Sequence, residues 1–164
     1  MLISWYRASN WLYRHHMSIL AKLIWKLSYV LFNSSLPPTA KIGEGTKLAY
    51  GGIGVVIHAR AVIGRNCILG QNITIGGKSG WYEVPIIGDN VHISAGARVL
   101  GPVRVGNNVI IGANAVVIKD VPDNCIVAGV PAKIIRDKIS KEELDGYKTV
   151  KYRGDQDWPV TPSE

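Results

Sequence analysis

Between Ile42 and Val130 the chain repeats one hydrophobic pattern with a period of six residues. Most units begin with an aliphatic residue followed by glycine, and a small or aliphatic residue comes four positions later. A period of six lacks the 3.6-residue component of a helix and is longer than the alternation of a hairpin. It predicts short strands and tight turns, with each aliphatic side chain stacked on its equivalent one coil away. The aliphatic–glycine pairs are Ile42-Gly43, Ile63-Gly64, Leu69-Gly70, Ile75-Gly76, Ile87-Gly88, Val105-Gly106 and Ile111-Gly112.

The number of units sets the size of the predicted solenoid. About a dozen units, at three per turn, predict roughly four coils. Glycines and the asparagines at 66, 90, 107 and 108 are residue types that tolerate the backbone angles of turns. The repeat is interrupted twice, by three extra residues at 51–53 and by a longer segment at 78–85. Loops of this kind often carry function.

The first 37 residues follow a different pattern. From Trp11 to Leu31 apolar residues recur at spacings of three and four, which predicts a helix that Pro37-Pro38 ends. Lys22 and Lys26 interrupt the apolar run, so it is too short to span a membrane. Two interpretations remain open. The helix packs against its own domain or oligomer, or it lies as a basic amphipathic helix on an anionic membrane surface.

Composition narrows the class of protein. Apolar residues make up 47% of the 164, which excludes a disordered chain. The net charge of +7 is concentrated in the first quarter, because five basic residues precede the first acidic one, Glu44. No nucleic-acid motif accompanies that charge, so we expect no nucleic-acid partner. Two cysteines, Cys67 and Cys125, are too few for a disulfide framework or a zinc ribbon.

Four motifs carry a resemblance to a known family. The chain resembles the hexapeptide-repeat acyltransferases, in the branch of serine acetyltransferase and of capsule and O-antigen polysaccharide O-acetyltransferases. The resemblance implies a mainly β protein, a left-handed parallel β-helix at 38–136, after an N-terminal helical segment at 1–37 and before a short polar tail at 137–164. The motifs are Gly-Val-Val-Ile-His at 54–58, Gly-Gln-Asn-Ile-Thr-Ile-Gly-Gly at 70–77, Ile-Gly-Ala-Asn-Ala-Val-Val at 111–117 and Ala-Gly-Val-Pro-Ala-Lys at 128–133.

The same resemblance implies a co-substrate and an assembly. Members of this family are trimers, with acetyl-CoA in a cleft between neighbouring subunits. Gly77, Ala95 and Ala113 match positions where the family's backbone approaches the pantetheine arm. Gly76, Gly77 and Lys78 begin the interrupting segment, where a ligand could approach the backbone with an ammonium beside it. Pro131 would shape the end of the cleft, and Lys119, Lys133 and Arg136 are candidates for the CoA phosphates, or else solvated charges.

Transfer of an acetyl group to a hydroxyl needs a general base, and histidine is the usual one near neutral pH. His58 and His92 flank inward residues of the repeat and should point outward, whereas the adjacent His15 and His16 suit a helix surface. The Asp-His pair of serine acetyltransferases is replaced here by Tyr50-Gly51. Their later Arg-His-Pro motif is replaced by Glu-Val-Pro at 83–85. We therefore hypothesise that His58 is the base, with His92 as a second catalytic candidate.

The same replacements shape the expected acceptor. A free amino acid carries two charges that need partners. The replaced motifs, at 50–51 and 83–85, lack the aspartate and the arginine that would hold these charges in the family. A sugar needs hydrogen bonds and an aromatic platform, which Tyr50, Gly51, Trp81 and Tyr82 would supply. We therefore expect a small-molecule or lipid-linked saccharide acceptor in surface polysaccharide synthesis. The expected location is the cytoplasm, at the inner face of the membrane if the N-terminal helix binds lipid.

Two other classes stay open. Serine O-acetyltransferase of cysteine biosynthesis would need a different set of serine contacts. A β-helix without transferase activity could be a scaffold, or a metal hydrolase of the carbonic anhydrase type. That hydrolase needs three histidines around one zinc, and only His58 and His92 lie in the repeats, so we expect no metal.

Overall fold

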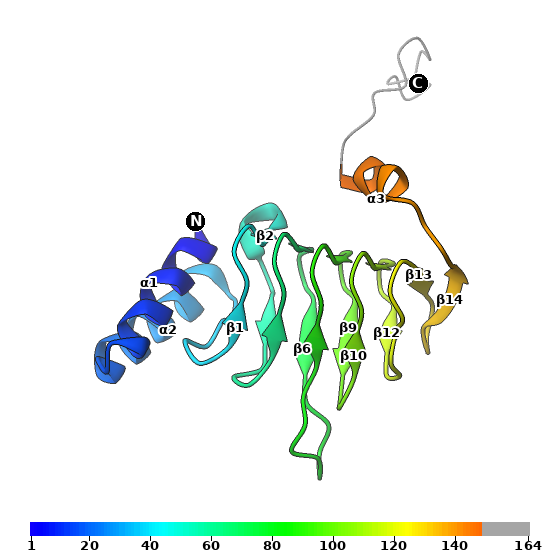
Figure 1. Ribbon diagram of the computed structural model, residues 1–164. Helices are drawn as coiled ribbons and strands as arrows, with labels where there is room; N and C mark the ends of the chain where they lie inside the picture. Colours follow the sequence, from blue (N-terminus) through cyan, green and yellow to red (C-terminus); the bar gives the residue numbers. More distant parts are fainter. Residues whose placement is uncertain (149–164) are drawn as a thin grey trace, which may run out of the picture.

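In the computed structural model, which describes residues 1–148, a helical hairpin packs against one end of a long parallel β-helix (Figure 1). The hairpin consists of α1 (Leu2–Arg14) and α2 (Ser18–Phe32). The sequence pattern correctly predicts helix here but runs through the turn between the two helices, where His16 has a φ of 61°. Apolar spacing alone does not reveal such a break, because the apolar residues keep their spacing on both sides of it.

The β-helix has three faces, each a sheet of short strands, and makes about four left-handed turns, as the repeat predicts. Neighbouring strands are parallel except for the pair β13–β14. The first face holds β1 (Lys41–Ile42), β4 (Val62–Ile63), β7 (Ile86–Ile87) and β10 (Arg104–Val105). The second holds β2 (Lys47–Leu48), β5 (Ile68–Leu69), β8 (His92–Ile93), β11 (Ile110–Ile111), β13 (Ile126–Ala128) and β14 (Lys133–Arg136). The third holds β3 (Val56–Ile57), β6 (Thr74–Gly76), β9 (Arg98–Leu100) and β12 (Val116–Val117).

The core consists of the aliphatic residues that begin each unit. On the first face Ile42, Ile63, Ile87 and Val105 stand in register, and each is almost fully buried. Each six-residue unit forms one of the three faces of a coil, so units that share a face are three units apart. The aliphatic side chain of each unit therefore stacks on that of the unit one coil earlier. Burying each such side chain stabilises the fold by roughly 1.5–3 kcal/mol relative to exposure.

The turns stack in the same way. Asn90 donates a side-chain hydrogen bond to Asn108, and Asn108 donates one to Asn124, at 3.1 and 2.8 Å. All three asparagines have positive φ, which asparagine tolerates better than most residues. At Gly43 a Cβ atom would lie 2.5 Å from the backbone of Gly64, so glycine is required by the close approach of successive coils.

Helix α1 covers the open edge of β1, the first strand of the solenoid. The hydroxyl of Tyr6 donates to the Ala40 carbonyl at 2.7 Å and accepts from the Ile42 N–H at 3.2 Å. Arg7 donates to the carbonyls of Ile42 and Gly43. These side chains replace the missing neighbouring strand, since unpaired backbone groups at a sheet edge otherwise need water. Burial raises the pKa of Tyr6, which keeps its hydroxyl a donor.

At the other end the chain folds back over the second face. The helix α3 (Lys141–Lys148) follows β14, and Ile139 and Leu144 form a small apolar cluster with Ile110 and Ile126. Arg136 forms an ion pair with Glu143. The remainder of the predicted polar tail, residues 149–164, lies outside the described residues.

The Tyr6 hydroxyl should contribute measurably to stability. Replacing Tyr6 with Phe removes both hydrogen bonds and leaves the Ala40 carbonyl without its donor, so we expect a loss of about 1–3 kcal/mol in the free energy of unfolding. Equilibrium denaturation of Tyr6→Phe measures this loss. Tyr13→Phe, at an exposed position of the same helix, serves as the control, and an equal effect in both variants would contradict a capping role.

Candidate active site

Two lines of turns run along the β-helix, and they hold most of the residues that the sequence singles out. We call the turns between the third and first faces the loop edge, made of residues 58–61, 77–85, 101–103 and 118–120. We call the turns between the second and third faces the alanine edge, made of residues 49–55, 70–73, 94–97 and 112–115. In Figure 1 the segment 77–85 projects from the loop edge below β6, away from the turn that follows β2.

His58 lies on the loop edge against the start of this projecting segment. It follows β3, and its backbone N–H donates to the Ile75 carbonyl of the next coil at 2.8 Å. A Cβ atom on Gly77 would lie 3.7 Å from Cδ2 and 3.8 Å from Nε2 of the His58 ring. The absence of a side chain at Gly77 therefore keeps the Nε2 side of the imidazole open to a small group.

The second ring nitrogen of His58 is already engaged. Nδ1 accepts a hydrogen bond from the backbone N–H of Arg60 at 3.1 Å. A neutral imidazole that accepts at Nδ1 carries its proton at Nε2, so the ring presents a donor toward Gly77. The hypothesis that His58 is a base then requires the Arg60 bond to be released, because the nitrogen with the free electron pair points at the main chain.

Arg60 holds the projecting segment in place. Its Nη2 donates to the Tyr82 carbonyl at 2.5 Å, and its guanidinium carbon lies 4.2 Å from the centre of the Tyr82 ring. Near the base of the segment the Lys78 ammonium lies 5.6 Å from the centre of the Trp81 ring. Both aromatic rings remain exposed. Arg60 is not among the site residues predicted from the sequence. An arginine in a turn has the same sequence pattern whether its side chain contacts a neighbouring coil or is solvated.

The second catalytic candidate, His92, lies elsewhere. It belongs to β8 on the second face, in register with Ile68 of β5 and Ile110 of β11, and is half-buried among these residues. His58 follows a strand of the third face. Within one chain the fold therefore separates the two histidines, and a mechanism that uses both at one centre is not supported by this arrangement.

The residues proposed for CoA divide between the two edges. Gly77, Lys78 and Lys119 lie on the loop edge next to Gly76, the last residue of β6, whereas Ala95 and Ala113 lie on the alanine edge. Pro131 follows β13 at the end of the solenoid, and Lys133 and Arg136 lie in β14. Arg136 is paired with Glu143, so a phosphate would have to compete with a carboxylate for it.

The proposed acceptor residues divide in the same way. Tyr50 and Gly51 form part of a 3₁₀ turn, η1 (Ala49–Gly52), on the alanine edge, and both have positive φ. Trp81 and Tyr82 lie on the loop edge. One chain therefore does not bring the four residues together, and a site that uses all of them requires two copies of the chain with different edges facing each other.

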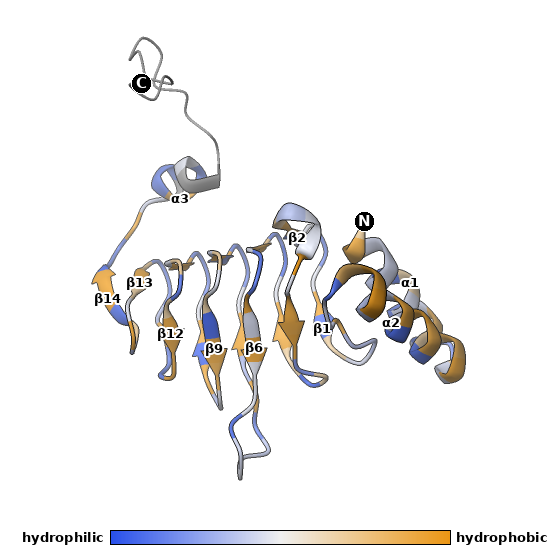
Figure 2. Cartoon of the chain, turned by 180° about the vertical axis from the view of Figure 1, so that it is seen from behind, coloured by the Kyte–Doolittle hydropathy of each residue, from blue (hydrophilic) through white to orange (hydrophobic). Residues whose placement is uncertain are grey.

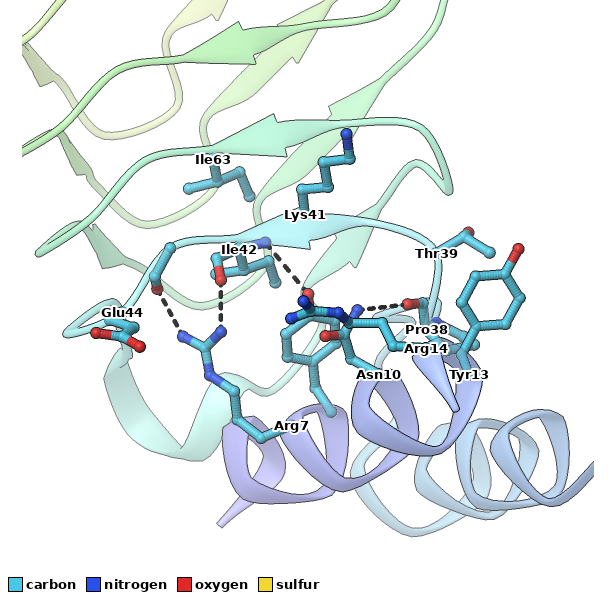
Figure 3. A pocket seen from close by; sticks show the side chains of 12 residues that line it. Arg7, Asn10, Tyr13, Arg14, Pro38, Thr39, Lys41, Ile42, Glu44 and Ile63 are labelled. Atoms are coloured by element: carbon cyan, nitrogen blue, oxygen red, sulfur yellow. Dashed lines mark hydrogen bonds between the residues drawn. The ribbon is translucent and has the colours of Figure 1, made fainter. Parts of the chain in front are cut away.

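A pocket of about 590 Å³ lies between α1 and the first coil (Figure 3). Arg14 and Lys41 line it together with Glu44, and Arg7 crosses it to reach the β1 carbonyls. Thr39, another lining residue, donates to the carbonyl of Ala59, which follows His58, at 2.8 Å. The pocket thus adjoins the N-terminal end of the loop edge at Thr39, and it is lined by cations that the sequence did not single out as site residues.

Within residues 1–148 no group of three or more His, Cys, Asp or Glu side chains is placed to hold a metal ion. The two cysteines are buried, and burial together with Asp123 and Asp137 raises the pKa of Cys125. The raised pKa disfavours the thiolate at Cys125. The loop edge thus offers an imidazole, backbone groups, aromatic rings, cations and the carboxylates of Glu83 and Asp120.

Comparison with known proteins places this architecture in a family. The family model described as bacterial transferase hexapeptide (six repeats) matches residues 85–119. The serine acetyltransferase of Synechococcus elongatus is 37% identical over 143 residues, which are 85% of this chain and 58% of that protein. That of Mycobacterium tuberculosis is 36% identical over 132 residues, 79% of this chain and 57% of that protein. The chain thus spans less than two thirds of the length of these relatives.

Solved structures give the same result. The crystal structure of Neisseria gonorrhoeae serine acetyltransferase superposes with a TM-score of 0.79 at 33% identity, covering 92% of this chain and 59% of that one. The Brucella abortus serine acetyltransferase in complex with coenzyme A gives a TM-score of 0.79 at 35% identity, covering 82% and 54%. The expected capsule and O-antigen branch receives no support from these matches. The chain is a hexapeptide-repeat protein homologous to the serine acetyltransferases.

Proposed function

We propose that this chain transfers the acetyl group of acetyl-CoA to the hydroxyl of serine. The observation that carries the proposal is its identity of 36–39% to serine acetyltransferases over 76–85% of its length. Neighbouring structures of such enzymes have been solved in complex with CoA and with cysteine.

This proposal replaces the expected saccharide acceptor, which the comparisons contradict. A sugar is expected only if the charged contacts of a serine zwitterion must come from the two replaced motifs. The structure offers other charged groups near the same edge. Arg60 and Lys78 lie in or against the projecting segment, Glu83 is part of it, and the pocket beside Thr39 holds Arg14 and Lys41. The absence of the two motifs therefore does not leave the chain without charged groups for a zwitterion.

Acetyl transfer requires that the serine oxygen forms a bond to the thioester carbon while the carbon–sulfur bond breaks. The hydroxyl proton must leave the oxygen, and the proton finally neutralises the CoA thiolate. In the proposal His58 takes this proton after the Arg60 N–H releases Nδ1 and the ring turns. Before that step Nε2–H faces the open space at Gly77, where it can donate a hydrogen bond to the carbonyl oxygen of the bound thioester and orient it.

The co-substrate would lie between two copies of the chain. Gly76, Gly77, Lys78 and Lys119 on the loop edge of one copy would face Ala95 and Ala113 on the alanine edge of the next. A cyclic trimer, the assembly that the family resemblance implies, repeats this junction three times and pairs every loop edge with an alanine edge. The small residues permit close approach of the pantetheine arm, and the lysines supply positive charge for phosphates.

Serine should be required for turnover. With acetyl-CoA as donor, we expect L-serine to produce free CoA thiol and O-acetylserine, and glycine, which lacks the hydroxyl, to produce neither. Thiol titration together with mass spectrometry of the product measures both. If acetyl-CoA binds but serine releases no CoA above background, the proposed function is wrong.

His58 should be the most sensitive side chain of the loop edge. We expect His58→Ala to lower kcat by about two orders of magnitude or more, because a general base contributes on that scale. His58→Gln, which can donate but cannot take up the proton, should be similarly impaired. His15→Ala, an exposed histidine of the hairpin, is the control. Turnover of His58→Ala within about threefold of the parent chain would exclude a role as base.

Arg60 should act by positioning the projecting segment. The Arg60 guanidinium holds the projecting segment by its hydrogen bond to the Tyr82 carbonyl and by its contact with the Tyr82 ring. A variant without the guanidinium loses both attachments. We expect Arg60→Gln to raise the KM for serine by about three- to tenfold with a smaller change in kcat, because substrate binding loses preorganisation. Arg60→Lys should recover part of the loss. Steady-state kinetics with Arg104→Gln as the control tests this, and an unchanged KM would contradict it.

A further inference from the structure

The outer side of α2 exposes a continuous apolar surface. Ile19, Val30 and Leu23 expose 82%, 77% and 60% of their area. Leu20, Leu27 and Leu31 extend this surface along the helix, each about half exposed. Figure 2 shows α2 in front of α1 and drawn mostly in the hydrophobic colour. We call these six residues the α2 surface.

The α2 surface is not required for the packing of the hairpin. The side of α2 that faces α1 is formed by the small residues Ala21 and Ser28, both buried, and the Ser9 hydroxyl donates to the Ala21 carbonyl at 2.8 Å. Phe32 at the end of α2 contacts Trp5 edge to face, with ring centres 5.7 Å apart. The large apolar side chains thus point away from the protein, the reverse of an ordinary amphipathic surface helix.

The charges around this surface have one sign. Residues 1–43 contain no Asp or Glu. Lys22 and Lys26 are exposed on α2 beside the α2 surface, and Arg14 is exposed at the end of α1. Trp11 and Tyr29 are exposed on the hairpin as well. Such amphipathic aromatic side chains favour the boundary between water and lipid.

We propose that the hairpin binds the surface of an anionic phospholipid bilayer, with α2 lying in the plane of the membrane and the α2 surface among the headgroups and upper acyl chains. Apolar area and basic charge act together in this mode of binding. Among residues 1–148 no helix is long and apolar enough to cross a membrane, so the proposal is for surface attachment alone. The proposal does not depend on the transferase activity.

A second copy of the chain is a poorer occupant of the same surface. Pairing two α2 helices would bring Lys22 and Lys26 of one copy near those of the other. The hairpin has no carboxylate to neutralise them, and like charges at close range oppose association. Anionic headgroups would neutralise the same lysines, so charge complementarity selects the bilayer.

Co-sedimentation of the full chain with vesicles tests the proposal. We expect binding to vesicles of phosphatidylcholine mixed with phosphatidylglycerol, and at least about tenfold weaker binding to phosphatidylcholine alone. Leu23→Ser/Val30→Ser and Lys22→Glu/Lys26→Glu should each reduce binding to the mixed vesicles by about tenfold or more. All four positions are exposed, so the variants should keep the melting temperature of the parent chain.

Arg104→Glu/Lys138→Glu is the matched control, because it changes the net charge equally at exposed positions outside the hairpin. It should retain vesicle binding. Equal binding of the lysine variant and the control would overturn the proposal, as would equal binding to both kinds of vesicle. Loss of self-association in Leu23→Ser/Val30→Ser, measured by analytical ultracentrifugation without lipid, would show instead that a second copy occupies the surface.

Discussion

The backbone N–H and C=O groups of each coil form hydrogen bonds with the next coil, and the rest of the structure depends on this constraint. Strands of two to four residues are too short to be stable alone, so each depends on its neighbours in the ladder. The first strand has no preceding neighbour, and Tyr6 and Arg7 of α1 supply its partners. Helix α1 also buries Leu2 and Tyr6 in the core, and α2 packs on α1 through Ala21 and Ser28 with its large apolar residues exposed.

The same constraint favours the turns over the faces as positions for functional side chains. Inward positions are filled by stacked aliphatic residues, and outward positions on the faces must keep register with the coils above and below. A turn tolerates inserted residues, because β6 and β7 keep their pairing with neighbouring coils on both sides of the 77–85 segment. Insertions therefore occur at turns, and the candidate site lies beside the insertion at 77–85. His58 and Arg60 contact that insertion because they occupy the neighbouring turn of the preceding coil.

The absence of two motifs does not by itself determine which acceptor the chain uses. The chain lacks two charged motifs of the serine acetyltransferases, yet its sequence and fold match those enzymes over most of its length. A zwitterion needs charges at particular points in space, and those points can be reached from other positions in the chain. Arg60 and Lys78 lie on the loop edge, and further cations line the pocket of Figure 3 beside Thr39.

The sequence by itself determined the solenoid, its core and its interruptions, because a six-residue period fixes which side chains point inward and where the ladder can be broken. It also placed a helical segment before the coils and an outward imidazole at His58. Only the tertiary structure decided which residues share an edge, since Tyr50 and Trp81 carry no local signal of the corner they occupy. It also decided that His16 breaks the helix and that Arg60 holds both His58 and Tyr82. The contact of Arg60 with Tyr82 joins two coils, and such residues come into contact only when the ladder closes.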